Sequence, residues 1–196
     1  DYGVIFLADN MIVTRACVAA SIAADPLPAS VCMWGTAIFS VTAAGTAPST
    51  YQWEREITPN SNNFVSLVDG STASWDGGGV GVGAIVSGSS TAAFTIAADT
   101  ANGNGLSAAH AIRYRCIVTN ACGSATSTPA ALTVFATGTG DANNDGLTDG
   151  NDVQALLNFV IAGGMPSAGL CAGDFTSNGL VDVADVPGFV NLLLGR

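Results

Sequence analysis

Two stretches of twelve residues near the end of the chain, 141–152 and 174–185, share one pattern of oxygen-bearing side chains. Each has Asp at its first, ninth and twelfth positions and Gly at its sixth, and the second begins 33 residues after the first. The match continues beyond the stretches, where Val153 corresponds to Val186. A pattern that repeats together with its flanking positions indicates an internal duplication. The end of the chain is therefore predicted to hold two copies of a loop followed by a helix.

The spacing of the oxygen atoms in each loop suits a hard cation. Calcium takes six to eight oxygen ligands, which a short chain supplies from alternate positions and again from the twelfth, with a Gly at the sixth for the sharp reversal. We therefore expect two calcium ions as cofactors. The ligands would be Asp141, Asn143, Asp145, the carbonyl of Leu147, Asp149 and Asp152 in the first loop, and Asp174, Thr176, Asn178, the carbonyl of Leu180, Asp182 and Asp185 in the second. The alternative is a pair of Asx-rich turns that cap two helices without metal.

The charge of the chain agrees with cation binding and excludes polyanionic partners. Fifteen acidic residues face five Arg and no Lys, which gives a net charge of −10. Nucleic acid and anionic membrane surfaces would be repelled. No apolar run is long enough to span a bilayer, so membrane insertion is not expected. No leader with a proper apolar core is visible, and we expect a mature form that has lost one.

Residues 26–135 read as short strands separated by clusters of Gly, Ser and Asn. Apolar and polar residues alternate around Phe39, Trp53, Phe94 and Cys116, which is the pattern of half-buried strands. Many short strands with turns between them predict an antiparallel sandwich. Residues 136–140, Ala-Thr-Gly-Thr-Gly, are predicted to be a small flexible linker.

The sandwich segment resembles a bacterial immunoglobulin-like domain. The resemblance is carried by Tyr51-Gln-Trp53, by Tyr114-Arg-Cys116 with the Asn-Ala-Cys122-Gly that follows, and by Leu132-Thr-Val134. It implies that Trp53 is the core tryptophan and that Tyr114 is the tyrosine-corner residue, with His110 four residues before it. It also implies a disulfide between Cys32 and Cys122, which leaves Cys116 as a buried thiol. Cys17 and Cys171 stay open: they pair with each other or remain free.

Residues 141–196 resemble dockerin domains. The resemblance rests on Asp at the twelfth loop position, on the absence of a helix before either loop, and on Cys171-Ala-Gly-Asp174 ahead of the second loop. It implies a small α-helical calcium-binding module. Dockerins typically bind cohesin modules, and the cellulosomal kind does so through hydroxyl residues at loop positions ten and eleven. Here those positions are Gly150-Asn151 and Val183-Ala184, so a cellulosomal cohesin is not the expected partner, and the exposed face could instead pack against the same chain or a sister subunit.

The first 25 residues form an apolar lead-in of strand-like character. Exposing so many apolar side chains would be costly. The segment therefore either adds a strand to its own sandwich or completes the sheet of a neighbouring copy. In the second case Val4, Ile5, Phe6 and Leu7 are the assembly residues, and a head-to-tail contact of this kind builds filaments.

Enzymatic function is not expected. His110 is the single histidine, and no Gly-x-Ser-x-Gly elbow accompanies it. Glu54 and Glu56 are expected to share one solvent-facing side of a strand, without a third group to separate their roles. The Gly-rich residues 79–84 lack the context of a phosphate-binding loop.

Five Cys in a Lys-free chain rich in Gly, Ser and Thr suit an oxidising compartment. The sequence thus predicts an extracellular or cell-surface, non-catalytic structural or assembly protein that binds calcium, with other copies of itself or another extracellular protein as partners. The alternative is a dockerin-type targeting module that attaches to a cohesin-like partner on a scaffold or cell surface.

Overall fold

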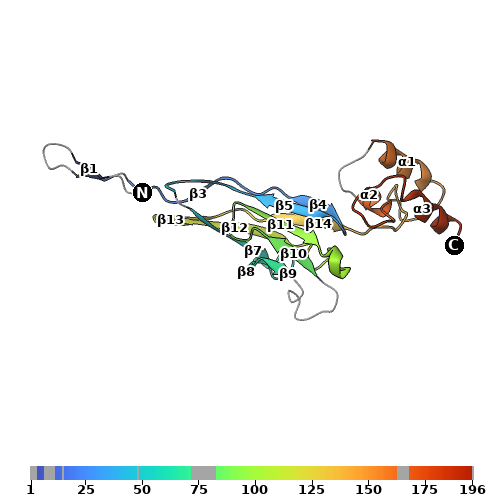
Figure 1. Cartoon of the computed structure of the whole chain (residues 1–196), viewed down its shortest axis with the longest axis horizontal. Helices are drawn as coiled ribbons and strands as arrows, with labels where there is room; N and C mark the ends of the chain where they lie inside the picture. The colour runs from blue at the N-terminus through green and yellow to red at the C-terminus, as the bar shows by residue number, and fades with distance from the viewer. Residues whose placement is uncertain are drawn as a thin grey trace.

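A computed structural model describes residues 4–6, 12–14, 16–47, 49–71, 83–162 and 168–195 of the chain. Three parts follow one another along its length: a small N-terminal hairpin at one end, a β-sandwich in the middle, and a helical module at the other end (Figure 1). Within the described residues, no helix has both the length and the apolar character that a membrane crossing requires.

One sheet of the sandwich has four strands in the order β5-β11-β10-β9, all antiparallel. The strands are β5 (Thr36–Ser40), β11 (Ala93–Ala98), β10 (Ala84–Ser87) and β9 (Gly70–Ser71). Alternate residues of β5 and β10 are buried, so this sheet has one face in the core and one face in solvent. A short 3-10 helix, η1 (Thr100–Asn102), follows β11.

The second sheet has the order β4-β14-β12-β7-β8, and β13 also pairs with β12. Its strands are β4 (Ala29–Cys32), β7 (Thr50–Glu56), β8 (Phe64–Ser66), β12 (Arg113–Asn120), β13 (Gly123–Thr126) and β14 (Ala130–Phe135). The pairing of β4 with β14 is parallel, and the other pairings are antiparallel. The edge strand β4 thus links the start of the sandwich directly to its last strand.

Four aromatic side chains form the centre of the core between the two sheets. Phe39 and Phe94 come from the smaller sheet, Trp53 and Tyr114 from the larger one, and their ring centroids lie 5.2 to 6.5 Å apart. All four are almost completely buried, as is Cys116. Two packed antiparallel sheets with this strand order, and a buried Trp on the strand paired with that of Tyr114, define an immunoglobulin-like sandwich. The predicted sandwich, with Trp53 in its core, is confirmed.

The N-terminal lead-in divides into two pieces instead of acting as one added strand. β1 (Val4–Phe6) and β2 (Ile12–Thr14) pair with each other and form a separate two-stranded sheet. β3 (Ser21–Ala24) pairs with β6 (Thr42–Ala44), which continues the line of β5. Only the second piece extends the sandwich. Val4, Ile5 and Phe6 lie in β1, and Leu7 lies outside the described residues.

The helical module contains α1 (Asp152–Ala162), α2 (Ala168–Ala172) and α3 (Val186–Leu193). As predicted, α1 follows the first acidic loop and α3 follows the second. The expectation that no helix precedes either loop is wrong for the second, because α2 ends two residues before Asp174. The module has its own small core around Leu156 and Phe189, with the ring of Phe175 packed edge-on against that of Phe189 at 6.0 Å.

The predicted linker 136–140 is bound to the module. The amide of Gly138 donates a hydrogen bond to the carbonyl of Cys171 at 3.3 Å, and the amide of Gly140 donates one to the carbonyl of Ala172 at 3.0 Å. Both acceptors belong to α2. The linker is therefore held along α2 by its own main chain.

The predicted disulfide between Cys32 and Cys122 is wrong. Cys17 pairs with Cys122 at a Cα–Cα distance of 5.9 Å, and Cys32 pairs with Cys171 at 5.3 Å. Cys32 lies beside Phe135, whereas Cys122 lies beyond the other end of β12. The eight residues of β12 separate those two ends by roughly 25 Å, which no disulfide can bridge. Cys116 is free and buried, as expected.

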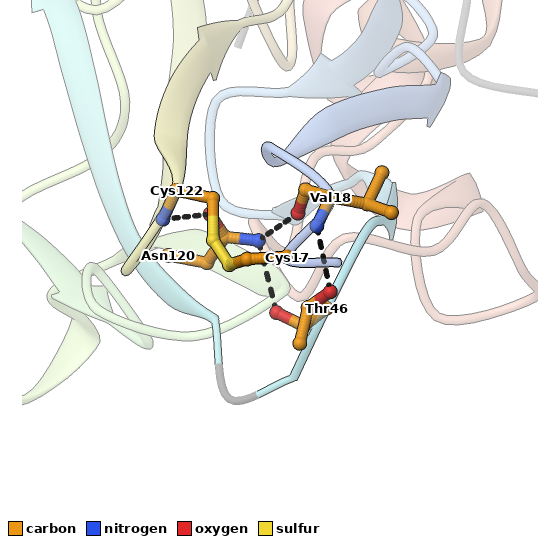
Figure 2. Close-up of a disulfide and its surroundings, with 5 residues drawn as sticks. All are labelled: Cys17, Val18, Thr46, Asn120 and Cys122. Atoms are coloured by element: carbon orange, nitrogen blue, oxygen red, sulfur yellow. Dashed lines mark hydrogen bonds between the residues drawn. A yellow bond between two sulfur atoms is a disulfide. The ribbon is translucent and has the colours of Figure 1, made fainter. Parts of the chain in front are cut away.

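The Cys17–Cys122 disulfide closes the end of the sandwich that is remote from the helical module (Figures 1 and 2). The side-chain Nδ2 of Asn120 donates hydrogen bonds of 2.9 Å to the main-chain carbonyls of both Val18 and Thr46. Its side-chain oxygen accepts one of 2.9 Å from the amide of Cys122. This single polar side chain thus joins three segments that meet at the disulfide.

Candidate metal centre

The first residue of each acidic loop holds the chain reversal that follows it. The carboxylate of Asp141 accepts hydrogen bonds of 3.0 Å from the amides of Asp145 and Gly146. In the second loop the carboxylate of Asp174 accepts them from the equivalent amides, Asn178 at 3.2 Å and Gly179 at 3.0 Å. The glycines adopt φ of 87° and 83°, in the left-handed region that favours Gly. The predicted glycine turns are therefore present in both loops.

The twelfth residue closes each loop from its other end. The carboxylate of Asp152 accepts hydrogen bonds from the amides of Asn143 at 3.0 Å and Asp149 at 2.8 Å. The carboxylate of Asp185 accepts them from Thr176 at 2.8 Å and Asp182 at 2.9 Å. The two loops share the same connections, so the sequence repeat is a repeat of structure.

The remaining predicted ligand positions also follow one scheme. The side-chain oxygens of Asp145 and Asn178, at the fifth position, accept hydrogen bonds of 2.9 and 2.8 Å from the amides two residues later. At the ninth position, Asp149 and Asp182 each accept one of 2.7 Å, again from two residues later. The structure therefore brings the first, fifth, ninth and twelfth side chains of each loop around one chain reversal.

Burial makes the charge of the loops energetically significant. Asp152, Asp174 and Asp185 have no solvent exposure. Burial raises the pKa of Asp174, against the hydrogen bonds from Gly179 and Asn178 that lower it, and the charge of Asp185 raises it further. Residues 141–195 contain no Arg, Lys or His to neutralise these carboxylates. Buried charges in proteins are normally paired or bound to a metal, so a cation fits the chemistry of this part of the chain.

Acidic side chains alone do not complete either site. Over the described ranges, no group of three or more Asp, Glu, His or Cys side chains is arranged to hold a metal ion. Calcium coordination also uses amide, hydroxyl and carbonyl oxygens, which Asn143, Thr176 and the carbonyls of Leu147 and Leu180 would supply. The ligand sets of the two ions stay predictions, consistent with the loop geometry.

The two glutamates of β7 are neutralised by arginines from β12. Contrary to the expectation of a solvent-facing pair, Glu56 is completely buried. It accepts hydrogen bonds from Arg113, with Nε at 2.9 Å, and from the amide of Asn62 at 2.8 Å. Arg115 donates from Nε to Glu54 at 2.8 Å. Antiparallel pairing of β7 with β12 places Arg115 directly opposite Glu54, and the same register continued by one pair places Arg113 opposite Glu56, which strand alternation alone does not reveal.

His110 is a buried structural residue. Its Nδ1 lies 3.0 Å from the amide of Ser107, which donates to it, and its main-chain carbonyl accepts from the hydroxyl of Tyr114 at 2.9 Å. The predicted tyrosine corner is thus present. Burial raises the pKa of Tyr114 and raises that of the Cys116 thiol to about 11, so both groups stay protonated at neutral pH.

No protein-family model matches the chain, and no curated protein matches its sequence. Several solved structures are similar to it. A chimeric titin Z1Z2 functionalized with a KLER exogenous peptide from decorin shares 24% identity over 62% of this chain and 99% of its own, with a TM-score of 0.39.

Two further solved structures are similar over a comparable share of the chain. The N-terminal Ig1-2 module of the Drosophila receptor protein tyrosine phosphatase DLAR shares 16% identity over 60% of this chain and 49% of its own, with a TM-score of 0.38. A Dscam structure that addresses isoform specificity shares 16% identity over 61% of this chain and 25% of its own, with a TM-score of 0.43. The chain therefore spans about half of the DLAR module and a quarter of the Dscam chain.

Proposed function

We propose that this protein is an extracellular, non-catalytic structural or assembly subunit whose helical module is stabilised by two calcium ions. The observation that carries the proposal is the duplicated loop. Each copy gathers equivalent oxygen-bearing positions around one reversal, with completely buried carboxylates and no basic residue at positions 141–195. When bound, calcium would supply the positive charge that these carboxylates lack.

The loops are placed where a cation would stabilise the whole module. The first loop leads from the linker into α1, and the second leads from α2 into α3. Asp152 and Asp185, at the starts of α1 and α3, would join each helix to the beginning of its loop through the ion. Because the module core is small, with Leu156 and Phe189 at its centre, much of its stability would come from the metal.

The chemistry of the described residues supports a non-catalytic role. Glu54 and Glu56 are paired with arginines, so neither is available as an acid or base. Cys116 is buried, with a pKa raised to about 11, and so does not act as a nucleophile. The two disulfides fit an extracellular setting.

Assembly would use the N-terminal hairpin. β1 and β2 form an isolated two-stranded sheet beyond the sandwich, at the opposite end of the molecule from the helical module (Figure 1). A two-stranded sheet has two open edges and is marginal by itself, so pairing with a sheet of the next copy would stabilise it. Such a contact, made through the segment 4–7, is head-to-tail and builds a filament.

A dockerin-type attachment module is the second candidate, and the outer face of the helices favours it. Val153, Leu157 and Ile161 follow one another at intervals of four along α1, and all are exposed. Val190 and Leu194 add exposed apolar groups at α3. A stripe of this kind suits an apolar surface of another extracellular protein.

Sedimentation velocity tests the assembly proposal and distinguishes the N-terminal hairpin from the helix face as the contact between copies. We would compare the intact chain, a chain without residues 1–13, and Leu157→Glu/Ile161→Glu, each with calcium and with chelator. The assembly proposal predicts large species from the intact chain and the double variant, and monomers from the truncated chain. An intact chain that stays monomeric at every concentration contradicts assembly. Assembly that the double variant alone abolishes favours the helix face instead.

A further inference from the structure

A disulfide attaches the second acidic loop to the sandwich, whereas the first loop follows the sandwich through the linker 136–140. Cys171, three residues before Asp174, forms the disulfide with Cys32 at the end of β4. Both cysteines are buried. The carbonyl of Cys171 accepts hydrogen bonds from the amides of Asp174 at 3.1 Å and Gly138 at 3.3 Å. Any movement of Cys171 therefore acts directly on the residue that begins the loop.

The turn of the second loop also lies against the sandwich. A Cβ placed on Gly179 would be 3.9 Å from the carbonyl oxygen of Trp34 and 4.0 Å from the Cα of Gly35. Gly35 donates a hydrogen bond of 2.9 Å to the carbonyl of Cys32, so this turn contains the disulfide partner. The equivalent position of the first loop, Gly146, has no described neighbour within 4 Å. Loop two is thus attached to the sandwich by a disulfide near its start and lies beside the sandwich at its reversal. Loop one has no disulfide beside it, and its reversal has no described neighbour within 4 Å.

We propose that the Cys32–Cys171 disulfide sets the calcium affinity of the second loop, and that the first loop binds independently of it. The inference rests on the proposed calcium function and adds a redox control to one of its two sites. With the disulfide intact, the sandwich holds the chain of loop two close to its closed form, which lowers the ordering cost of binding. Without it, Cys171 and Asp174 gain freedom that calcium must remove.

The coupling acts in both directions. If the disulfide favours calcium at loop two, calcium must favour the disulfide by the same factor. Because Cys171 is completely buried, a reductant reaches it only after local opening of the module. Calcium bound at loop two suppresses that opening and so protects the disulfide. The rate of its reduction therefore reports on the second site.

The redox step is ordinary thiol–disulfide exchange. A thiolate of an external dithiol such as dithiothreitol attacks one sulfur, the Cys32–Cys171 bond breaks, and a mixed disulfide forms. The second thiol of the reagent then displaces the protein thiol. Two electrons and two protons pass to the protein, which ends with two thiols, and the reagent becomes a cyclic disulfide.

The experiment uses the full chain with one loop disabled at a time. Asp152→Ala disables the first loop and leaves calcium binding to the second. Asp185→Ala disables the second loop and leaves calcium binding to the first. Calcium titration calorimetry on each background, with and without Cys32→Ala/Cys171→Ala, measures the effect of the disulfide. The expected result is a loss of affinity of about tenfold at loop two, within the range usual for coupled sites, and none at loop one. Cys17→Ala/Cys122→Ala removes the remote disulfide and should leave both affinities unchanged.

A second measurement needs no substitution of the cysteines. Time-resolved reduction of the native chain with dithiothreitol, alkylation and peptide mass mapping gives the rate for each disulfide. If the opening releases the ion, calcium at about ten times its Kd for loop two should slow reduction of Cys32–Cys171 about tenfold and leave Cys17–Cys122 unaffected. Equal rates with and without calcium, or equal loop-two affinity without the disulfide, overturn the inference and leave the calcium function intact. Absence of calcium binding to the unmodified chain overturns both.

Discussion

The hydroxyl of Tyr114 donates a hydrogen bond of 2.9 Å to the main-chain carbonyl of His110, inside the sandwich core. The contact ties the start of β12 to the loop before it, and both residues are completely buried. Tyr114→Phe removes the donor and leaves a buried carbonyl unsatisfied. We expect the fold to persist with a loss of about 1–3 kcal/mol in the free energy of unfolding. Urea denaturation followed by tryptophan fluorescence measures it, and an unchanged midpoint with an unchanged slope would contradict this role.

The buried Glu56–Arg113 pair should matter far more than the neighbouring Glu54–Arg115 pair. Removing one partner of a fully buried pair costs roughly 3–5 kcal/mol. Because the side chain of Arg113 is 27% exposed, we expect about 2 kcal/mol for Glu56→Gln. Glu54→Gln, the matched control, should cost less than about 1 kcal/mol. If the two substitutions lower the free energy of unfolding equally in chemical denaturation, the burial of Glu56 does not strengthen its ion pair.

The same pair predicts a loss of stability in acid. The hydrogen bonds from Arg113 lower the pKa of Glu56 to about 2, against the opposing effect of burial. A lowered pKa stabilises the folded chain above the unfolded value, near 4.3, and this contribution disappears as the pH falls towards 2. The stability difference between the unmodified chain and Glu56→Gln should therefore shrink between about pH 4.5 and pH 2. A difference that stays constant over that interval excludes the pair as its source.

Cys116 should be unreactive in the folded chain. Its thiol is buried, burial raises its pKa to about 11, and the other four cysteines are in disulfides. Without reductant, iodoacetamide should label nothing in the native protein and one site per chain after denaturation, because the thiolate is the reactive form. Mass spectrometry of the intact chain reads the number of labels. Rapid native labelling, or more than one label after denaturation, would contradict the pairing of the cysteines.

Gly188 allows α3 to approach the second loop closely. A Cβ at this position would lie 2.6 Å from the Cβ of Phe175, which cannot rotate away. Alanine gains about 1 kcal/mol in helix propensity, whereas forcing an extra methyl group into a packed contact costs about 1–3 kcal/mol. We therefore expect Gly188→Ala to increase hydrogen exchange in α3. Gly150→Ala, where a Cβ meets no described atom within 4 Å, should leave exchange unchanged. A slower exchange in Gly188→Ala would mean that propensity outweighs packing.

Local patterns predicted the parts of the fold that depend on neighbouring residues. The period of the duplicated loops located α1 and α3, and strand alternation located Phe39, Trp53 and Tyr114 in one core. The glycines at the sixth loop positions adopt the left-handed conformation that the repeat required. In each case, residues that are close together in the sequence are sufficient to explain the local structure.

Features that depend on which segments meet were not predicted. The disulfides join residues 105 and 139 positions apart, and their pairing follows from the end of the sandwich at which each cysteine lies. The burial of Glu56 depends on Arg113 across the sheet, which only the register of β7 with β12 provides. The pairing of β1 with β2 could have been suggested by the two apolar runs of the lead-in, but an added strand explains the same pattern.

Calcium titration of the full chain tests the central claim most directly. After chelator treatment and desalting, calorimetry should show two calcium ions per chain, with the first loop tighter because it offers four carboxylates and the second only three. Asp152→Ala should abolish or greatly weaken the first site, whereas Asn151→Ala, its neighbour without a ligand role, should leave both sites in place. The duplicated loops therefore predict that Asp152→Ala loses the first site and keeps the second, and that Asn151→Ala keeps both. A chain that takes up no calcium, or that binds equally well with Asp152→Ala and Asp185→Ala combined, would contradict it.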